Sequence, residues 1–195
     1  MSNDKKGLIV VISGPSGVGK GTIIQRLKQI VDNCVFSVSA TTRSPRPGEV
    51  NGKDYFFISK EDFEENIRNQ KMLEYTMYNG NYYGTPEASA REAAAQGNIV
   101  LLDIEVEGAG NVKKIIPESV SIFIMPPSKS ALEQRLIGRG TETVDQIRGR
   151  LNIANREMDL SENYDYIVTN DSIDRAAQEI RRIILKEQAR LNRPY

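Results

Sequence analysis

The sequence predicts an α/β fold in which a mainly parallel sheet is flanked by helices. Apolar runs without polar alternation, typical of strands buried on both faces, alternate along the chain with amphipathic stretches of helical spacing. One region interrupts this pattern, because residues 36–83 hold short alternating runs around turn-rich segments. That region predicts a small mixed or antiparallel insert beside the main sheet.

The expected elements follow from these patterns in chain order. Residues 8–12 are wholly apolar and predict the first buried strand, and residues 19–31 carry the apolar spacing of a helix. Within the insert, strands are expected at 55–58 and 72–78. Further strands are expected at 98–104, 120–125 and 164–169, and further helices at 86–96, 108–116, 128–137, 144–160 and 173–191.

The length of 195 residues suits one domain, residues 1–195, that buries a sizeable core without disulfides. Within it we expect three parts. They are a core of residues 7–35, 84–127 and 163–192, the insert at about 36–83, and a helical lid at about 128–162.

The composition excludes several kinds of function. Lys+Arg and Asp+Glu both number 26, so no bulk charge directs the protein to nucleic acid or to a membrane surface. With Cys34 as the one cysteine and no histidine, an internal disulfide, a Cys/His zinc cluster and a histidine general base are all excluded. The apolar run at 8–12 is too short for a signal sequence or a membrane span, so we expect a cytoplasmic protein.

A phosphate-binding loop is predicted directly after the first strand. Its residues are Gly14, Pro15, Ser16, Gly17, Val18, Gly19, Lys20, Gly21 and Thr22. Gly14, Gly19 and Lys20 match the G-x-x-x-x-G-K pattern of P-loop proteins, in which glycines turn backbone N–H groups inward at a helix N-terminus and the lysine meets phosphate oxygens. A glycine-rich turn with a solvated lysine is the alternative, and the buried strand before it and the helix after it disfavour that alternative.

The loop departs from the full pattern at the position after the lysine. A serine or threonine hydroxyl there usually contacts Mg²⁺, whereas this chain has Gly21 there and a hydroxyl one place later, at Thr22. Either Thr22 takes part or the metal is held mostly through water. Asp103, at the carboxyl end of a buried strand, is the expected acidic partner of the metal, and a helix cap or structural ion pair is its alternative role.

The insert carries a second candidate anion site. Arg43 and Arg46 lie three residues apart around a proline, and two guanidinium groups so placed suit a phosphate dianion. Tyr55 and Tyr83 add hydroxyls and aromatic faces, and Glu74, in an otherwise apolar strand, could accept two N–H bonds from the edge of a base. Each also has an ordinary explanation, as a solvated loop charge, a core aromatic residue or a salt-bridge partner.

At this point the chain resembles the guanylate kinase family over roughly residues 7–185. The resemblance rests on segments far more specific than the phosphate loop. They are Ser39-Ala40-Thr41-Thr42-Arg43-x-x-Arg46, residues 48–55 (GEVNGKDY), Glu74-Tyr75, residues 80–84 (GNYYG) and residues 138–143 (GRGTET). The resemblance implies a P-loop NTPase core, a GMP-binding subdomain and an arginine-bearing lid. It also implies transfer of the γ-phosphoryl group of ATP to GMP, and to dGMP, with Mg²⁺ as the metal.

The resemblance assigns roles at matching positions. Arg43, Arg46, Tyr55 and Tyr83 would hold the GMP phosphate, and Ser39 and Glu74 would read the guanine edge. Thr85 stands where serine is common and is a weaker substrate contact, while Glu105 stands where aspartate is common. The remaining assignments are Asn170 on the adenine side of ATP and the lid arginines Arg135, Arg139 and Arg150.

The lid arginines suit a transfer without a covalent enzyme intermediate. Arg135 and Arg139 fall at i and i+4 on one helix face, with Gly138 and Gly140 as candidate hinges, although a solvated helix face is the alternative. Because the GMP phosphate is already anionic, in-line transfer needs no general base, and positive charge offsets the repulsion between two polyanions. Lys20, Arg43, Arg135, Arg139, Arg150 and Mg²⁺ would supply that charge.

Two other functions stay open from the sequence. A non-catalytic guanylate-kinase-like module that binds partner peptides is disfavoured, because such modules typically lose the phosphate loop that this chain keeps. A kinase of similar architecture that acts on another phosphorylated nucleoside or sugar is the closer rival. The family is often dimeric, so a homodimer is an expected assembly, but no segment of the sequence identifies its interface.

Overall fold

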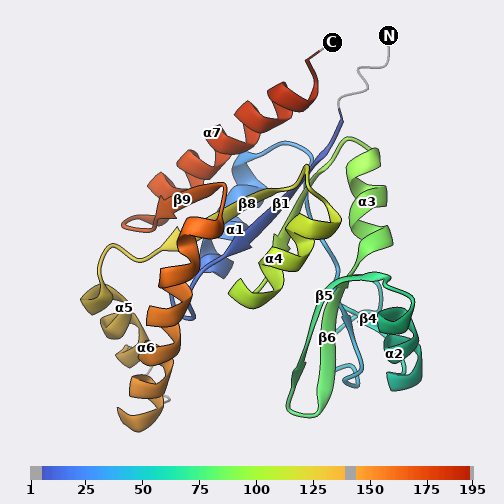
Figure 1. Cartoon of the computed structure of the whole chain (residues 1–195), viewed down its shortest axis with the longest axis horizontal. Helices are drawn as coiled ribbons and strands as arrows, with labels where there is room; N and C mark the ends of the chain where they lie inside the picture. Colours follow the sequence, from blue (N-terminus) through green and yellow to red (C-terminus); the bar gives the residue numbers. More distant parts are fainter. Residues whose placement is uncertain (1–5, 139–143, 194–195) are drawn as a thin grey trace.

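The computed structural model describes residues 6–138 and 144–193 and confirms an α/β fold with a parallel central sheet (Figure 1). Five parallel strands form this sheet in the order β2-β7-β1-β8-β9. They are β1 (Leu8–Ser13), β2 (Cys34–Phe36), β7 (Ile99–Asp103), β8 (Val120–Met125) and β9 (Tyr166–Thr169). Their carboxyl ends therefore meet at one edge of the sheet.

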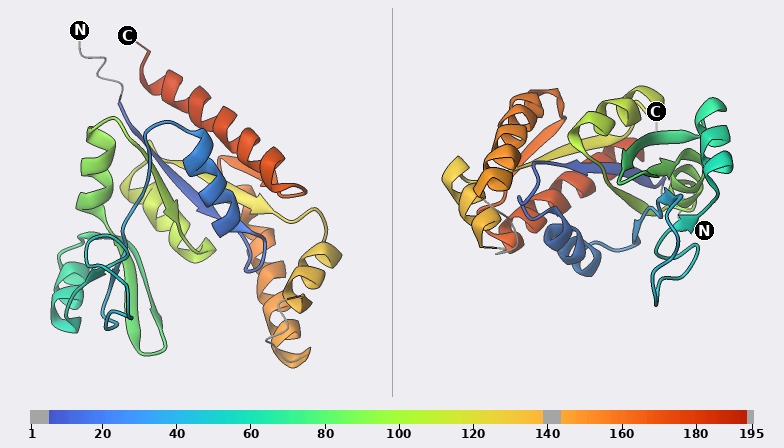
Figure 2. Two further views of the ribbon diagram at one scale, coloured as in Figure 1. Left: turned by 180° about the vertical axis from the view of Figure 1, so that it is seen from behind. Right: turned by 90° about the horizontal axis from the view of Figure 1, so that it is seen from below.

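Helices cover both faces of the central sheet (Figure 2). Even-numbered side chains of β1, such as Val10, face α1 (Lys20–Ile30) and α7 (Ile173–Leu191). Odd-numbered ones, such as Val11, belong to a second apolar cluster with α3 (Glu87–Ala95) and α4 (Val106–Ile115). Because both faces are buried, the strands gain from apolar side chains at every position, which explains the lack of polar alternation.

The insert forms a second, mixed sheet of order β4-β3-β6-β5. Its strands are β3 (Ala40–Thr41), β4 (Phe56–Phe57), β5 (Met72–Tyr78) and β6 (Asn81–Pro86). Strands β5 and β6 make an antiparallel hairpin that projects from the core, and Asn79 and Gly80 close it with φ angles of 47° and 75°. Asn-Gly is the pair that a tight hairpin turn of this kind favours.

Helix α2 (Lys60–Arg68) in the insert was not predicted from the sequence. The Ser59 hydroxyl caps it by accepting the N–H of Asp62 at 3.0 Å, and the buried Phe63 stacks on Tyr82 with ring centroids 5.0 Å apart. The S-x-x-D pattern before an apolar residue was the signal that identifies this helix. Strand β2 was also missed, because three residues are too few to show a period.

The segment predicted to form a lid, called the lid below, consists of α5 (Lys129–Ile137), α6 (Val144–Asp159) and the single turn η1 (Leu160–Asn163). It has a small core of its own, in which Leu132, Leu136 and Ala154 are buried against Ile147 and Leu151. Arg139 and Gly140 lie outside the described residues. Among the helices of the described residues, none is both long enough and apolar enough to cross a bilayer.

Candidate active site

The loop between β1 and α1 has the backbone of an anion-binding nest. Gly17 and Gly19 have φ angles of 87° and 102°, in the left-handed region that side chains disfavour. A Cβ on Gly19 would lie 2.7 Å from the amide nitrogen of Asn170, so this position requires glycine for space as well as for conformation. No described side chain caps α1, whose first turn also holds no acidic residue. The first N–H groups of α1 are thus available to an anion.

Lys20 lies at the mouth of this loop. Its Nζ atom donates a hydrogen bond of 2.8 Å to the carbonyl oxygen of Gly14, so the side chain folds back over the loop. This places one ammonium charge beside the nest, where phosphate oxygens would meet it.

Asp103 ends β7 next to the end of β1, where it pairs in register with Ile12. Its carboxylate still contacts solvent, yet the surrounding protein excludes enough water to raise its pKa; nearby Lys20 lowers the pKa and Glu105 raises it. Thr22 is exposed in the first turn of α1. Among the described residues, no group of three or more acidic, cysteine or histidine side chains could hold a metal ion. A divalent ion would therefore depend on water and phosphate oxygens as well.

Arg43 in the insert is held by a carboxylate that sequence reasoning missed. Its guanidinium nitrogens make two hydrogen bonds, of 2.9 and 3.0 Å, with Glu49, which also accepts the backbone N–H of Arg46 at 2.7 Å. The side-chain hydrogen bond from Arg43 is the largest cause that lowers the pKa of Glu49. Glu49 lies in the motif of residues 48–55, three residues after Arg46, and this spacing was the sequence feature that could have identified it as a partner of Arg43.

Aromatic residues surround the same guanidinium. Arg43 lies 5.6 Å from the ring centroid of Tyr55 and 5.8 Å from that of Phe57. Tyr55 and Tyr83 meet edge to face, with centroids 6.0 Å apart. The hydrogen bond with Glu49 is the largest cause that raises the pKa of Arg43, and the Tyr83 side chain raises it further. The structure thus gathers Arg43, Tyr55 and Tyr83. The side chain of Arg46 is exposed in the adjoining loop.

Glu74 on β5 and Thr85 on β6 form the second polar pair of the insert. The Thr85 hydroxyl donates a hydrogen bond of 2.7 Å to the Glu74 carboxylate. Burial raises the pKa of Glu74, the Thr85 hydrogen bond lowers it, and the neighbouring charge of Glu105 raises it. Helix α4 reaches this pair closely, since a Cβ on Gly108 would lie only 3.2 Å from the Cβ of Glu74. Ser39 precedes β3, and its carbonyl oxygen accepts the N–H of Phe56 at 2.8 Å.

The lid is docked on the phosphate loop. Arg135 donates hydrogen bonds of 2.9 Å to the carbonyl oxygens of Val18 and Asn170. Asn170 is 1% exposed and donates to the same Val18 oxygen at 2.7 Å, so its side-chain amide helps to hold the loop. Arg150 donates to the hydroxyl of Ser16. The predicted lid arginines Arg135 and Arg150 and the predicted ATP contact Asn170 therefore all contact the loop itself.

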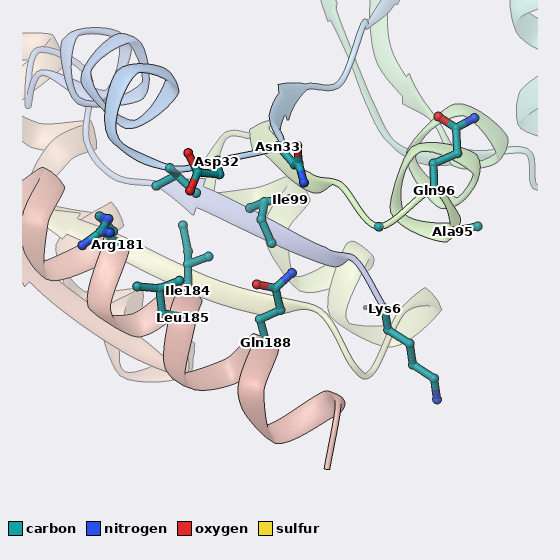
Figure 3. A pocket seen from close by; sticks show the side chains of 12 residues that line it. Lys6, Asp32, Asn33, Ala95, Gln96, Ile99, Arg181, Ile184, Leu185 and Gln188 are labelled. Carbon is teal, nitrogen blue, oxygen red and sulfur yellow. The ribbon is translucent and has the colours of Figure 1, made fainter. Parts of the chain in front are cut away.

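A large cavity lies away from this site, at the amino ends of the strands (Figure 3). It measures about 760 Å³ and is lined by α7 and by the turns before β2 and β7. Asn33 and Gln188 point toward its interior on either side of Ile99, whereas Lys6 points away. Because β1 enters here and leaves at the phosphate loop, the two features are at opposite ends of the sheet.

Comparisons with known proteins agree with this architecture. A family model described as guanylate kinase matches residues 6–187. A guanylate kinase of Bacillus cereus is 50% identical over 190 residues, which cover 97% of this chain and 93% of the relative. One from Halalkalibacterium halodurans is 47% identical over 189 residues, with the same coverage. The crystal structure of guanylate kinase from Anaplasma phagocytophilum is 36% identical, has a TM-score of 0.71, and is matched over 95% of this chain and 88% of that one.

Proposed function

The chain belongs to the guanylate kinase family and is an ATP-dependent kinase of GMP, and we propose how its residues perform that transfer. The triphosphate of ATP binds in the loop between β1 and α1, held by inward N–H groups, the positive end of α1 and Lys20. The triphosphate site also includes the neighbouring loop residues Pro15, Gly21 and Thr22. Asn170 supports the loop.

The acceptor GMP binds in the insert. Its phosphate lies against Arg43, Arg46, Tyr55 and Tyr83, and Glu49 holds Arg43 in place until the phosphate arrives. The guanine base lies toward Glu74, whose carboxylate can accept two N–H bonds from the base edge. Ser39, Thr85 and Glu105 complete this recognition.

The donor chemistry of the site fits Mg²⁺, because the hydroxyl of Thr22 and the carboxylate of Asp103 are oxygen ligands beside the phosphate loop. We propose that both hold the ion mainly through water. When bound, the ion neutralises part of the charge on the transferred phosphoryl group.

Catalysis in this proposal is positioning together with charge stabilisation. The acceptor phosphate oxygen attacks the γ-phosphorus in line, the bond to the leaving ADP oxygen breaks, and no covalent enzyme intermediate forms. Lys20, Arg43, Arg135 and Arg150 face the charge that spreads over the transferring group, and Arg139, outside the described residues, is assigned the same role. The lid excludes water and so limits hydrolysis of ATP.

The observation that carries the proposal is the uncapped, left-handed glycine loop with Lys20 folded over it and the lid arginines docked on it. The test is Lys20→Ala, for which we expect kcat/KM for GMP to fall by at least about 10³. ADP release should be measured with GMP, dGMP, AMP, CMP and UMP. Near-normal turnover of the variant would remove Lys20 from the chemistry, and equal rates with AMP and GMP would refute the base assignment.

Three finer points belong to the same proposal. We propose that dGMP is also an acceptor, that the enzyme works in the cytoplasm, and that it forms a homodimer; the first and third points follow the family resemblance. The substrate panel tests the first point, localisation of a tagged chain tests the second, and light scattering at several protein concentrations tests the third.

A further inference from the structure

One acidic side chain beside the phosphate loop has no part in the mechanism above. Glu157 lies on α6, seven residues or about two turns after Arg150, and therefore on the same side of that helix. Its Oε2 atom is buried and has no hydrogen-bond partner in the described part of the chain. A carboxylate oxygen buried without a partner is costly, so its place calls for an explanation.

The surroundings of Glu157 belong to the phosphate site. Burial raises its pKa, while the charge of Lys20 and the backbone N–H of Ser16 lower it. The negative charges of Glu105 and Glu107 raise it. Burial raises the pKa of nearby Tyr164, the side chain of Ser13 lowers it, and the charge of Glu157 raises it. The favourable partners of this carboxylate are thus the loop N–H and the ammonium group that phosphate oxygens would otherwise engage.

Arg150 and Glu157 carry opposite charges on α6 and therefore have opposite effects on the affinity for a triphosphate. Arg150, docked on the Ser16 hydroxyl, is attracted to the phosphates. Glu157 carries the same sign of charge as the ligand, and it loses its interaction with Lys20 and Ser16 as phosphate oxygens take them over. In the empty loop, by contrast, the same carboxylate offsets part of the positive potential of the nest.

We propose that Glu157 is an internal competitor of ATP, which occupies the Ser16 and Lys20 side of the empty phosphate loop and is displaced when the triphosphate binds. This inference rests on the proposed placing of ATP in the loop. In this proposal the carboxylate helps to hold the lid against the loop when no nucleotide is bound. It also weakens binding of the triphosphate. Binding of the triphosphate is therefore coupled to a rearrangement of α6.

The test is binding of a non-hydrolysable ATP analogue, AMP-PNP, measured by calorimetry without GMP. Glu157→Gln keeps the shape of the side chain and removes its charge, and we expect its Kd to be lower than that of the unchanged chain by at least about fivefold. The matched control is Glu162→Gln, which makes the same charge change at an exposed position of η1. Its Kd should stay within about twofold, because exposed charges are screened.

Lys20→Ala separates failure of this inference from failure of the proposed function. If Lys20→Ala binds AMP-PNP as the unchanged chain does, the triphosphate is not in this loop and both statements fail. If Lys20→Ala loses binding while Glu157→Gln binds equally or more weakly, the loop assignment stands and the competitor is refuted. A gain in affinity with an unchanged Kd for GMP is not a result that a damaged fold produces.

Discussion

Glu74, the proposed acceptor for the edge of the guanine base, carries a cost to the fold. Burial raises its pKa above that of an unfolded glutamate, so the folded chain holds this proton more tightly than the unfolded chain does. The stability linked to Glu74 is therefore present at pH below its ordinary pKa and is lost as the pH rises through the raised value. Above the raised pKa the ionised carboxylate is retained at the expense of stability, as expected if it accepts N–H bonds from the base in the proposed role.

We predict that Glu74→Gln raises Tm by a few degrees at pH 8 and that this gain disappears near pH 4, where the native glutamate is protonated. The same variant should lose much of its preference for GMP over AMP, because an amide offers one acceptor and one donor where the carboxylate offers two acceptors. Thermal unfolding at both pH values and the two kcat/KM values check this. Glu92→Gln, at an exposed position of α3, is the control for the charge change. A lower Tm at pH 8 would contradict the assigned cost.

At the scale of elements, helix α2 depends on a cap that another helix of the chain lacks. Ser59 caps α2 through its hydroxyl, whereas Ser172, which precedes α7, makes no side-chain cap hydrogen bond with the described residues. We predict that Ser59→Ala lowers the free energy of unfolding by about 1 kcal/mol and that Ser172→Ala changes it by less than about 0.5 kcal/mol. Urea unfolding of the two variants measures the difference. Equal losses would show that the Ser59 hydroxyl bond contributes nothing specific.

Element length also decides how much of the structure the sequence predicts. The long apolar strands and the amphipathic helix α7 show their period over enough residues to be found. Strands β2 and β3 are three and two residues long and are defined by pairing with partners distant in sequence, which no local pattern records. The same holds within the site. The loop and the motif residues can be identified from the sequence. The hydrogen bonds between Arg43 and Glu49 and the position of Glu157 near the loop depend on the tertiary structure, which the sequence pattern does not record.

At the scale of the whole molecule, the proposed site is assembled from parts that have separate apolar cores. The central sheet has a cluster on each face, the insert has a third around Phe63, and the lid has a fourth around Leu136. The lid contacts the loop through Arg135 and Arg150, and Leu136 lies so near that a Cβ on Gly17 would stand 2.7 Å from its Cδ2 atom. A small separate core can open locally without unfolding the rest.

Two matched substitutions test whether the lid is such a unit. Leu136 and Leu101 are 1% and 0% exposed, and truncation of a buried leucine to alanine costs about 2–5 kcal/mol. For Leu101→Ala, in the central sheet, we predict a Tm lower by about 2–4 °C for each kcal/mol lost, with kcat little changed at temperatures where the chain is folded. For Leu136→Ala we predict the opposite pattern. The Tm of the main unfolding transition should change little, while kcat/KM should fall at least about tenfold because the lid arginines lose the packing that supports them. Calorimetry and the GMP assay on both variants decide the matter: equal shifts in Tm would mean that lid and sheet unfold as one cooperative unit, and full activity in Leu136→Ala would mean that the lid core does not position the arginines.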